Sequence, residues 1–238
     1  SEPDFWLLYH ETVAWTQVEL TSKKAPPPSA FATAVCVDNK IYAYGGLKEN
    51  GKCEGEMWCG DISGLLTSDI RKTISWEVLK TKKAPSPRYG HTCVKAGNKL
   101  VFFGGSKNND FHNDIHYFDT TTHTFSKPNC SGMMPEGRCY HSANILGNKL
   151  YIFGGMGKNK IFSDVCMFDV DTDGWTKMML SGAPKARFGH SATAVGNSIV
   201  MWGGRTLPPE NKQSTDGDLV DSFASGIPVF DTEKRGWS

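Results

Sequence analysis

KLYIFGG (Lys149–Gly155) is one of four closely similar stretches in this chain, and the others are KIYAYGG (Lys40–Gly46), KLVFFGG (Lys99–Gly105) and SIVMWGG (Ser198–Gly204). Their first glycines lie 59, 50 and 49 residues apart. A pattern with a period near 50 residues indicates one supersecondary unit that is used several times. Folds of this kind act mostly through loops on one face, so the sequence directs attention to surfaces.

Other residues keep a fixed distance from these glycines. An Arg-x-x-His segment ends 13 residues before the first glycine of the last three stretches, as Arg88–His91, Arg138–His141 and Arg187–His190. In the first repeat the same places hold Ser29, Ala30, Phe31 and Ala32. Downstream come an aspartate and an aromatic residue, in the pairs Asp61 and Trp76, Asp119 and Phe125, Asp169 and Trp175, and Asp231 and Trp237.

Short apolar runs between these marks predict β-strands. Examples are His91–Ala96, Lys99–Phe103, Asp114–Asp119 and Gly174–Met178, and turn formers such as Gly147-Asn148 bound them. Each repeat therefore supplies four antiparallel strands, named here a (Arg-x-x-His), b (Gly-Gly), c (Phe-Asp) and d (Trp). No segment has a long 3.6-residue apolar period, so the fold class is all-β.

A single four-stranded sheet cannot bury both of its faces, and sheets that pack face to face around an axis solve this problem. A period of this length with four strands per unit is typical of a β-propeller. After strand b the backbone is expected to need a positive φ or a close approach that only glycine permits. The residues predicted to have such repeated structural roles are Gly45, Gly46, Gly104, Gly105, Gly154, Gly155, Gly203, Gly204, His91, His141, His190, Trp15, Trp76, Trp175 and Trp237.

The diglycine, the downstream Asp and Trp, and a Pro-x-x-Arg-x-x-His segment led by Pro85, Pro135 or Pro184 resemble kelch repeats. The resemblance covers nearly the whole chain, although the first copy lacks the Arg and His. It implies a kelch-type β-propeller of four-stranded antiparallel blades. It also implies a non-catalytic module that binds a protein or peptide partner, of which the substrate-recognition module of a ubiquitin ligase is a special case.

We expect one propeller domain over residues 1–238, with a half blade at 1–20 and blade units at about 29–80, 88–128, 138–180 and 187–238. Strands c and d of the half blade are predicted at Asp4–His10 and Ala14–Leu20. This makes four to five blades, whereas propellers of this kind close with roughly five to seven. The chain is therefore interpreted as an excerpt of a larger propeller, and the alternative is a small ring whose half blade is completed irregularly.

Composition narrows the class of partner. The net charge is +1 and no long basic run is present, which argues against nucleic acid as the main ligand. No apolar stretch approaches the roughly 18 residues of a membrane span, so no membrane partner is expected. The seven cysteines show no Cys-x-x-Cys spacing, which favours reduced thiols and a cytoplasmic or nuclear location.

Four arginines are the candidate partner-binding residues: Arg88, Arg138, Arg187 and Arg205. The first three stand where the chain enters strand a, so a propeller would gather them at one mouth of its channel, where guanidinium groups bind carboxylates. Arg205 opens a polar b–c insertion, Arg205–Gly226, which would overhang the same face. Two interpretations stay open for the arginines: a site for an acidic partner, or pairing with Asp119, Asp169 and Asp231 that fixes neighbouring blades. The insertion is likewise either a binding loop or a tolerated insertion.

The three histidines, His91, His141 and His190, are expected to be structural, because metal sites usually draw their ligands asymmetrically. No catalytic residue, metal site or cofactor is predicted. The alternative function is a metal-dependent enzyme or small-ligand binder of the kelch type that uses these histidines.

Overall fold

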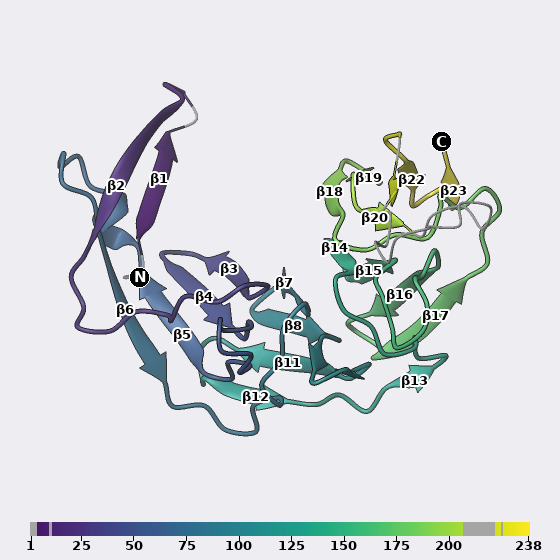
Figure 1. Ribbon diagram of the computed structural model, residues 1–238, viewed down its shortest axis with the longest axis horizontal. Coiled ribbons are helices and arrows are strands. Elements are labelled where there is room, and N and C mark those ends of the chain that lie inside the picture. The colour runs from purple at the N-terminus through teal and green to yellow at the C-terminus, as the bar shows by residue number, and fades with distance from the viewer. Residues whose placement is uncertain (1–3, 10, 207–221, 225) are drawn as a thin grey trace, which may run out of the picture. The chain divides into compact units, whose positions relative to one another are not determined.

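The computed structural model describes residues 4–9, 11–206, 222–224 and 226–238, and short β-strands dominate it (Figure 1). The chain divides into two compact units. The first unit is Ser1–Tyr89 with Phe118–Ser126, and the second is Gly90–Tyr117 with Lys127–Ser238.

The first unit contains a six-stranded sheet in the order β1-β2-β6-β5-β4-β3 (Figure 1). Its strands are β1 (Phe5–Tyr9), β2 (Ala14–Leu20), β3 (Thr33–Val37), β4 (Lys40–Tyr44), β5 (Met57–Asp61) and β6 (Thr73–Leu79), with a 3-10 turn, η1 (Ser63–Leu65), between β5 and β6. Strands β3 to β6 are strands a to d of the first repeat, in antiparallel order.

The predicted half blade is present as the hairpin β1–β2. One face of it packs with Trp58, Ile74 and Trp76 through Phe5, Leu7 and Val18. On the other face Trp6 and Trp15 are 53% and 62% exposed. The strand pair is therefore confirmed, but Trp15 is not a core residue as Trp76 is.

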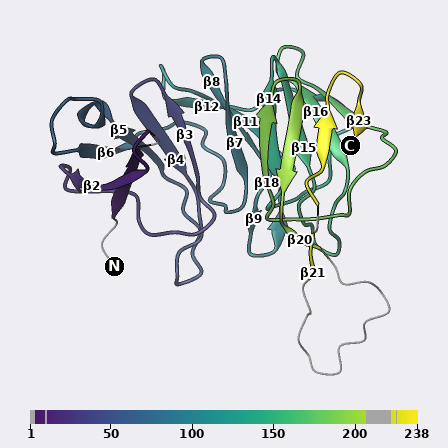
Figure 2. The ribbon, with the colours of Figure 1, turned by 90° about the horizontal axis from the view of Figure 1, so that it is seen from above.

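The remaining repeats supply three further blade sheets, in the orders β12-β11-β8-β7, β13-β17-β16-β15-β14 and β18-β19-β22-β23, besides two two-stranded hairpins in their loops. Their strands are β7 (Thr92–Ala96), β8 (Lys99–Phe103), β11 (Ile115–Asp119), β12 (Thr124–Ser126), β13 (Ser131–Gly132), β14 (Ser142–Leu146), β15 (Lys149–Phe153), β16 (Val165–Asp169), β17 (Gly174–Met178), β18 (Ser191–Val195), β19 (Ser198–Trp202), β22 (Val229–Asp231) and β23 (Gly236–Trp237). In the second unit β14 lies beside both β7 and β18, so the a strands are neighbours (Figure 2). This is the blade arrangement that the repeats predict.

The alternation of side chains along β15 shows how a sheet of the second unit is buried on both faces. Leu150 and Ile152 belong to a core cluster with Val101 and Phe168. Tyr151 and Phe153 point the other way, into a cluster with Met201 of the next repeat. Successive residues of a strand face opposite sides of the sheet, so an unbroken apolar run such as LYIF is required where both sides are covered.

A short parallel pairing, not foreseen in the sequence, adds to the antiparallel blades. The end of one strand d, or the segment that follows it, pairs with strand d of the following repeat, as Leu20↔Ile74, Lys82↔Thr124 and Gly132↔Trp175. These segments are called straps below. They explain why two of the sheets have more than four strands.

The diglycines have the backbone that was predicted for them. All eight have positive φ, between 63° and 107°. At Gly154 a Cβ would also lie 2.5 Å from the carbonyl oxygen of Arg187, and the N–H of Gly155 donates to that oxygen at 2.8 Å. The second glycine of the pair thus binds the start of the next repeat.

Candidate functional site: the b–c loop face

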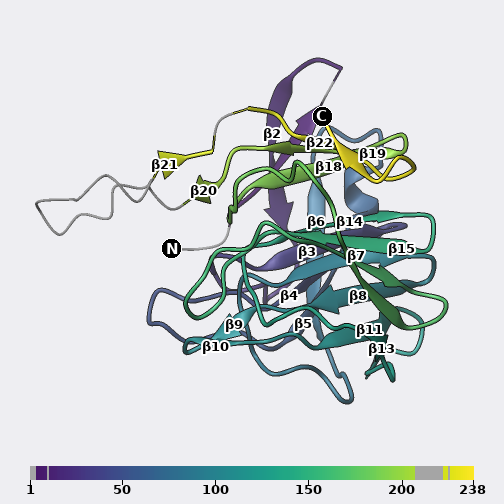
Figure 3. The same ribbon diagram turned by 90° about the vertical axis from the view of Figure 1, so that its right-hand side faces the viewer.

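The loops between strands b and c gather at one end of the second unit. They are the hairpin β9 (Ser106–Lys107) with β10 (Asp110–Phe111), the loop 156–161, and β20 (Arg205–Thr206) with β21 (Ser222–Phe223). Figures 2 and 3 show β9 and β20 on the same side of the unit, which we call the b–c loop face. Most of the predicted insertion Arg205–Gly226 lies outside the described residues, namely 207–221 and 225. Arg205 itself is described and exposed.

A cavity of about 720 Å³ opens on this face between the b–c loops of the second and third repeats. Phe111 and the buried ring of Phe162 supply its apolar lining. The rest of its lining is Asn108, Asn109, Asp110, Glu136, Gly137, Gly157, Lys158, Asn159 and Lys160. The amide and charged side chains can form hydrogen bonds with a peptide backbone, and the two aromatic rings can hold one apolar side chain of the peptide. The lining therefore has the groups that recognise a peptide.

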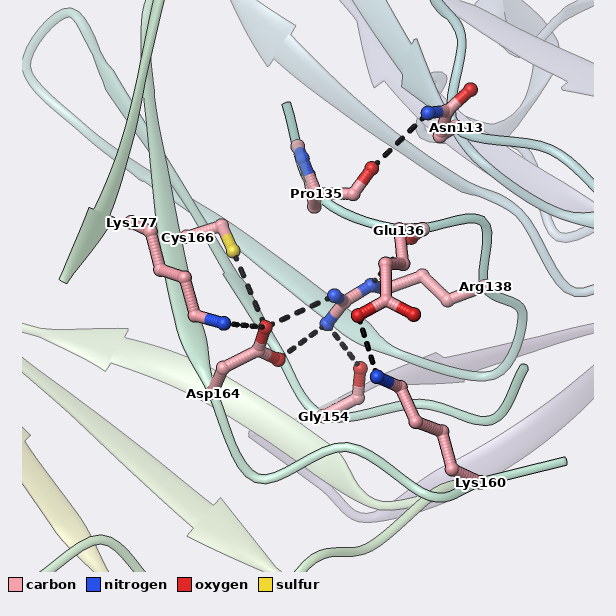
Figure 4. A network of polar contacts seen from close by, with 9 residues as sticks. All are labelled: Asn113, Pro135, Glu136, Arg138, Gly154, Lys160, Asp164, Cys166 and Lys177. Carbon is pink, nitrogen blue, oxygen red and sulfur yellow. Dashed lines mark hydrogen bonds and ion pairs between the residues drawn. The ribbon is translucent and has the colours of Figure 1, made fainter. Parts of the chain in front are cut away.

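Arg138 is fully buried, and its guanidinium packs on the ring of Phe162, which lines the cavity. Figure 4 shows its polar contacts. Its guanidinium binds both carboxylate oxygens of Asp164, at 2.7 and 3.1 Å, and donates to the carbonyl oxygen of Gly154 at 3.0 Å. The ring of Phe162 covers it at 3.9 Å. Burial alone would raise the pKa of Asp164, but the hydrogen bonds and charge of Arg138 more than offset this and hold the pKa below its usual value.

The expected pairing of the arginines with the strand-c aspartates is therefore wrong for Arg138. Its partner Asp164 lies in the same blade, five residues before Asp169. The strand-c aspartates shape the c–d turns instead, because one oxygen of each accepts two backbone N–H groups. The bonds are 2.8 and 2.8 Å for Asp119, 3.0 and 3.1 Å for Asp169, and 3.0 and 2.8 Å for Asp231.

Arg88 and Arg187 are also buried, with 3% and 2% exposure. In the first unit Arg88 donates to the carbonyl and hydroxyl oxygens of Ser86, both at 3.0 Å. In the second unit Arg187 donates to the carbonyl oxygens of Gly203 and Lys185, at 3.1 and 3.3 Å. Desolvation lowers the pKa of Arg187. Partner binding by Arg88, Arg138 and Arg187 stays a prediction, and Arg205 is the exposed member of the set.

The fourth repeat differs from the third at the position that corresponds to Asp164. The carbonyl of the second glycine of the pair accepts from Phe162 in the third repeat and from Ala224 in the fourth. This register places Ala224 where the third repeat has Phe162, and Gly226 where it has Asp164. Among the described residues, Arg187 therefore has neither the carboxylate nor the aromatic cover that Arg138 has.

The repeated histidines connect neighbouring repeats of the second unit. Nε2 of His141 lies 2.9 Å from the hydroxyl of Thr92, and Nε2 of His190 lies 2.8 Å from the hydroxyl of Ser142. Nδ1 of both rings is buried without a hydrogen-bond partner. The proton of the neutral ring is therefore placed on Nε2, which donates to the hydroxyl oxygen. His91 is likewise buried, with 4% exposure.

Burial of the neutral imidazoles predicts a loss of stability in mild acid. Desolvation, followed by the charge of Arg187, lowers the pKa of His190 to about 4, and desolvation holds the pKa of His141 well below its usual value. The unfolded chain therefore binds more protons than the folded chain between pH 6.5 and 4, and stability falls as the pH drops through that window. Urea unfolding at pH 7.5 and 5 should show a loss of about 2 kcal/mol from His190 alone.

A His190→Gln variant tests the source of this loss. Glutamine does not titrate and can still donate to Ser142, so the difference between the two pH values should shrink by about 2 kcal/mol. An unchanged difference would show that other groups cause the acid sensitivity.

Two recurring signals would have identified residues that the sequence analysis missed. An aspartate follows the first glycine of the pair by ten residues in two repeats, as Asp114 and Asp164. A hydroxyl residue directly follows each repeated histidine, as Thr92, Ser142 and Ser191. The cavity had no such signal, since its lining comes from loops that do not repeat.

The part of the chain that the structure describes contains no group of three or more His, Cys, Asp or Glu side chains placed to hold a metal ion. No helix within it is long and apolar enough to span a bilayer. All seven cysteines are free thiols.

The chain is similar to known proteins that contain kelch repeats. Residues 1–204 match the family described as the KLHDC2/KLHL20/DRC7 Kelch-repeats domain. Kelch domain-containing protein 3 of Rattus norvegicus is 30% identical over 223 residues, which are 86% of this chain and 54% of that protein. The Rab9 effector protein with kelch motifs of Homo sapiens is 31% identical over 111 residues, which are 46% of this chain and 28% of that protein.

Among solved structures, YjhT superposes with a TM-score of 0.70 and 19% identity, over 91% of this chain and 72% of that one. The fold is thus that of a β-propeller repeat protein. Because the family match covers most of its length, the chain belongs to the kelch-repeat family. It spans about half, or less, of the length of the relatives named above.

Proposed function

We propose that this chain is a non-catalytic interaction module that binds a peptide or protein partner on the b–c loop face. Its kelch relatives support a protein-interaction propeller. The single observation that carries the location is the cavity of about 720 Å³, which has aromatic, amide and charged groups in its lining. The buried Arg138 and Asp164 pair positions the ring of Phe162 in that lining.

An acidic group on the partner would bind at the fourth repeat. Arg205 is exposed there, and its guanidinium lies 6.0 Å from the ring centre of Phe188. A carboxylate from the partner would bind the exposed guanidinium of Arg205 by bidentate hydrogen bonds.

Selection of peptides from a random displayed library on the purified chain tests this proposal. We expect the recovered peptides to be enriched in Asp and Glu, and their affinity to fall at least tenfold with Lys158→Glu in the cavity or Arg205→Glu beside it. Lys234→Glu is the matched control, because Lys234 is exposed on a c–d turn. The affinity of the Lys234→Glu variant for these peptides should stay within about twofold of that of the unchanged chain.

Recovered peptides whose affinity is unaffected by both loop-face variants would place binding elsewhere and reject the proposed face. Peptides without acidic residues that still lose affinity with Lys158→Glu would reject only the acidic preference. A role as the substrate-reading part of a ubiquitin ligase, in the cytoplasm or nucleus, is a narrower form of the same proposal. Two results together would support that form. A cullin should co-purify with the protein from cells whether or not Arg205 and Lys158 are replaced, and a substrate protein should co-purify only when both residues are intact.

A further inference from the structure

A second cavity of the second unit lies between strands of the third repeat and the c–d turn of the fourth repeat. Its volume is about 550 Å³. We call it the Met–Arg cleft, after the apolar side chains and the cations that line it, which are Met167, Met178, Leu180, Lys149, Lys177 and Arg235. No residue of a b–c loop lines it, so the cleft is separate from the b–c loop face.

The charged groups of the Met–Arg cleft are all positive. Lys149, Lys177 and Arg235 line it, and its described lining contains no aspartate or glutamate. Nζ of Lys177 lies 3.9 Å from Asp164, a carboxylate that already accepts two hydrogen bonds from Arg138. Three cations around one cleft attract an anionic group.

The preceding interface, between the second and third repeats, shows how the same place is filled elsewhere in the second unit. The residues at the corresponding positions are Lys99, Tyr117 and Asp173. The hydroxyl of Tyr117 donates to the carboxylate of Asp173 at 2.5 Å, and Nζ of Lys99 lies 4.8 Å from the centre of the phenol ring. Tyr117 is only 7% exposed, so these side chains fill the space between the two repeats.

Two of these three residues are exchanged at the Met–Arg cleft. Met167 corresponds to Tyr117, and Arg235 corresponds to Asp173. Asp173 and Arg235 have the same turn conformation, with φ of 54° and 51°, so the charge is reversed on an unchanged backbone. Methionine has no hydroxyl to donate, and Arg235 and Lys149 repel each other. The cleft therefore has the space and the charge for a carboxylate from another molecule.

The backbone of β17 offers a further contact beside the cleft. The parallel pairing of β17 with β13 ends at Trp175, whereas β17 continues to Met178. Over the described residues, no strand pairs with the outer edge of Thr176–Met178, and all three of these residues line the cleft. An unpaired strand edge beside a groove with side-chain contacts is where an extended peptide can add as a further strand.

We propose that the Met–Arg cleft binds an extended acidic segment of a protein partner, as a second site besides the b–c loop face. An aspartate or glutamate of the segment pairs with Arg235 and Lys149, in the place that Asp173 has at the other interface. An apolar side chain two residues away lies on the same side of the extended segment and packs on Met167 and Met178, since methionine adapts to different apolar shapes. The backbone of the segment bonds to the outer edge of β17.

Selection of peptides on a chain without a functional b–c loop face tests this proposal. The chain carries Lys158→Glu and Arg205→Glu, so binding of peptides recovered from a random displayed library is independent of the first site. We expect Asp or Glu two positions from Leu, Ile, Val or Phe, and an affinity that falls at least tenfold with Arg235→Glu. Lys234→Glu is the matched control, because Lys234 lies on the same turn but outside the cleft, and its side chain is 84% exposed. This control should change the affinity by less than about twofold.

Spectra of methyl-labelled methionine locate the bound peptide. The methyl signals of Met167, Met178 and Met179, which line the cleft, should shift when a recovered peptide is added. The signals of Met156 in a b–c loop and of Met57 in the first unit should stay in place. Each signal is assigned from its Met→Leu variant.

A variant with a filled cleft completes the test. Met167→Tyr combined with Arg235→Asp restores the pair that Tyr117 and Asp173 form, so it should abolish peptide binding and leave the urea midpoint unlowered. If this variant folds poorly, the comparison of Arg235→Glu with Lys234→Glu still decides.

Three outcomes would overturn the proposal. The first is a selection that recovers no binding peptide, and the second is binding that Arg235→Glu does not weaken. The third is a set of peptides that lack acidic residues or shift only the signals of Met156 or Met57. Each of these leaves the b–c loop face untouched, because that face is tested on the chain with Lys158 and Arg205 intact.

Discussion

Replacement of Asp164 by alanine is expected to lower the free energy of unfolding by about 3–5 kcal/mol. Asp164 is the carboxylate partner of Arg138, whose side chain is completely buried, so its removal leaves an unpaired charge in the interior. The carbonyl of Gly154 would remain as a hydrogen-bond acceptor, but it carries no charge. Urea denaturation at pH 7 measures the change.

Glu136→Ala is the matched control, because it breaks an ion pair of the same region that faces solvent. Glu136 and Lys160 are 63% and 51% exposed at their side chains, and a pair of this kind contributes about 0–1 kcal/mol. If Asp164→Ala cost no more than Glu136→Ala, Arg138 would have to find another carboxylate, and the architectural role of the pair would be refuted.

Trp175→Ala should cost about 3–5 kcal/mol of stability, the largest effect expected from a single core side chain. The indole is 3% exposed and packs at a tilt against aromatic rings, with its ring centre 4.8 Å from that of Phe168 and 5.1 Å from that of Phe103. The cavity left by the indole would lie between two sheets, where neither backbone can collapse into it. The midpoint and slope of urea unfolding give the value.

The chain contains its own control for this change. Trp15 has the same position in strand d of the half blade but is 62% exposed, so Trp15→Ala should change stability by less than about 1 kcal/mol. Equal losses at the two positions would mean that the exposed face of β1–β2 is covered in solution.

The repeated elements of the fold could be predicted because each rests on local chemistry. The diglycines adopt positive φ, the apolar run of β15 is covered on both faces, and the strand-c aspartates accept N–H groups of the following turn. Each of these features can be recognised within a single repeat. The straps could not be predicted, since the pairing of Gly132 with Trp175 depends on tertiary proximity and leaves no pattern in Ser131–Gly132.

The candidate site was predicted less well than the fold. The sequence placed arginines and loops on one face, but it could not show which carboxylate each arginine meets. The sequence analysis singled out Asp169 and missed Asp164, yet Asp164 binds Arg138 while Asp169 accepts from the backbone of its own c–d turn. The cavity beside Phe162 depends on loop conformations, which vary from repeat to repeat.

The straps also have a consequence for synthesis on the ribosome. In each strap the residue that pairs is translated well before its partner, as Leu20 precedes Ile74 and Gly132 precedes Trp175. When strand d of a new blade leaves the exit tunnel, the strap residue with which it pairs has therefore already been synthesised. The repeats can therefore fold in the order of translation, and each new repeat can pack against the one completed before it.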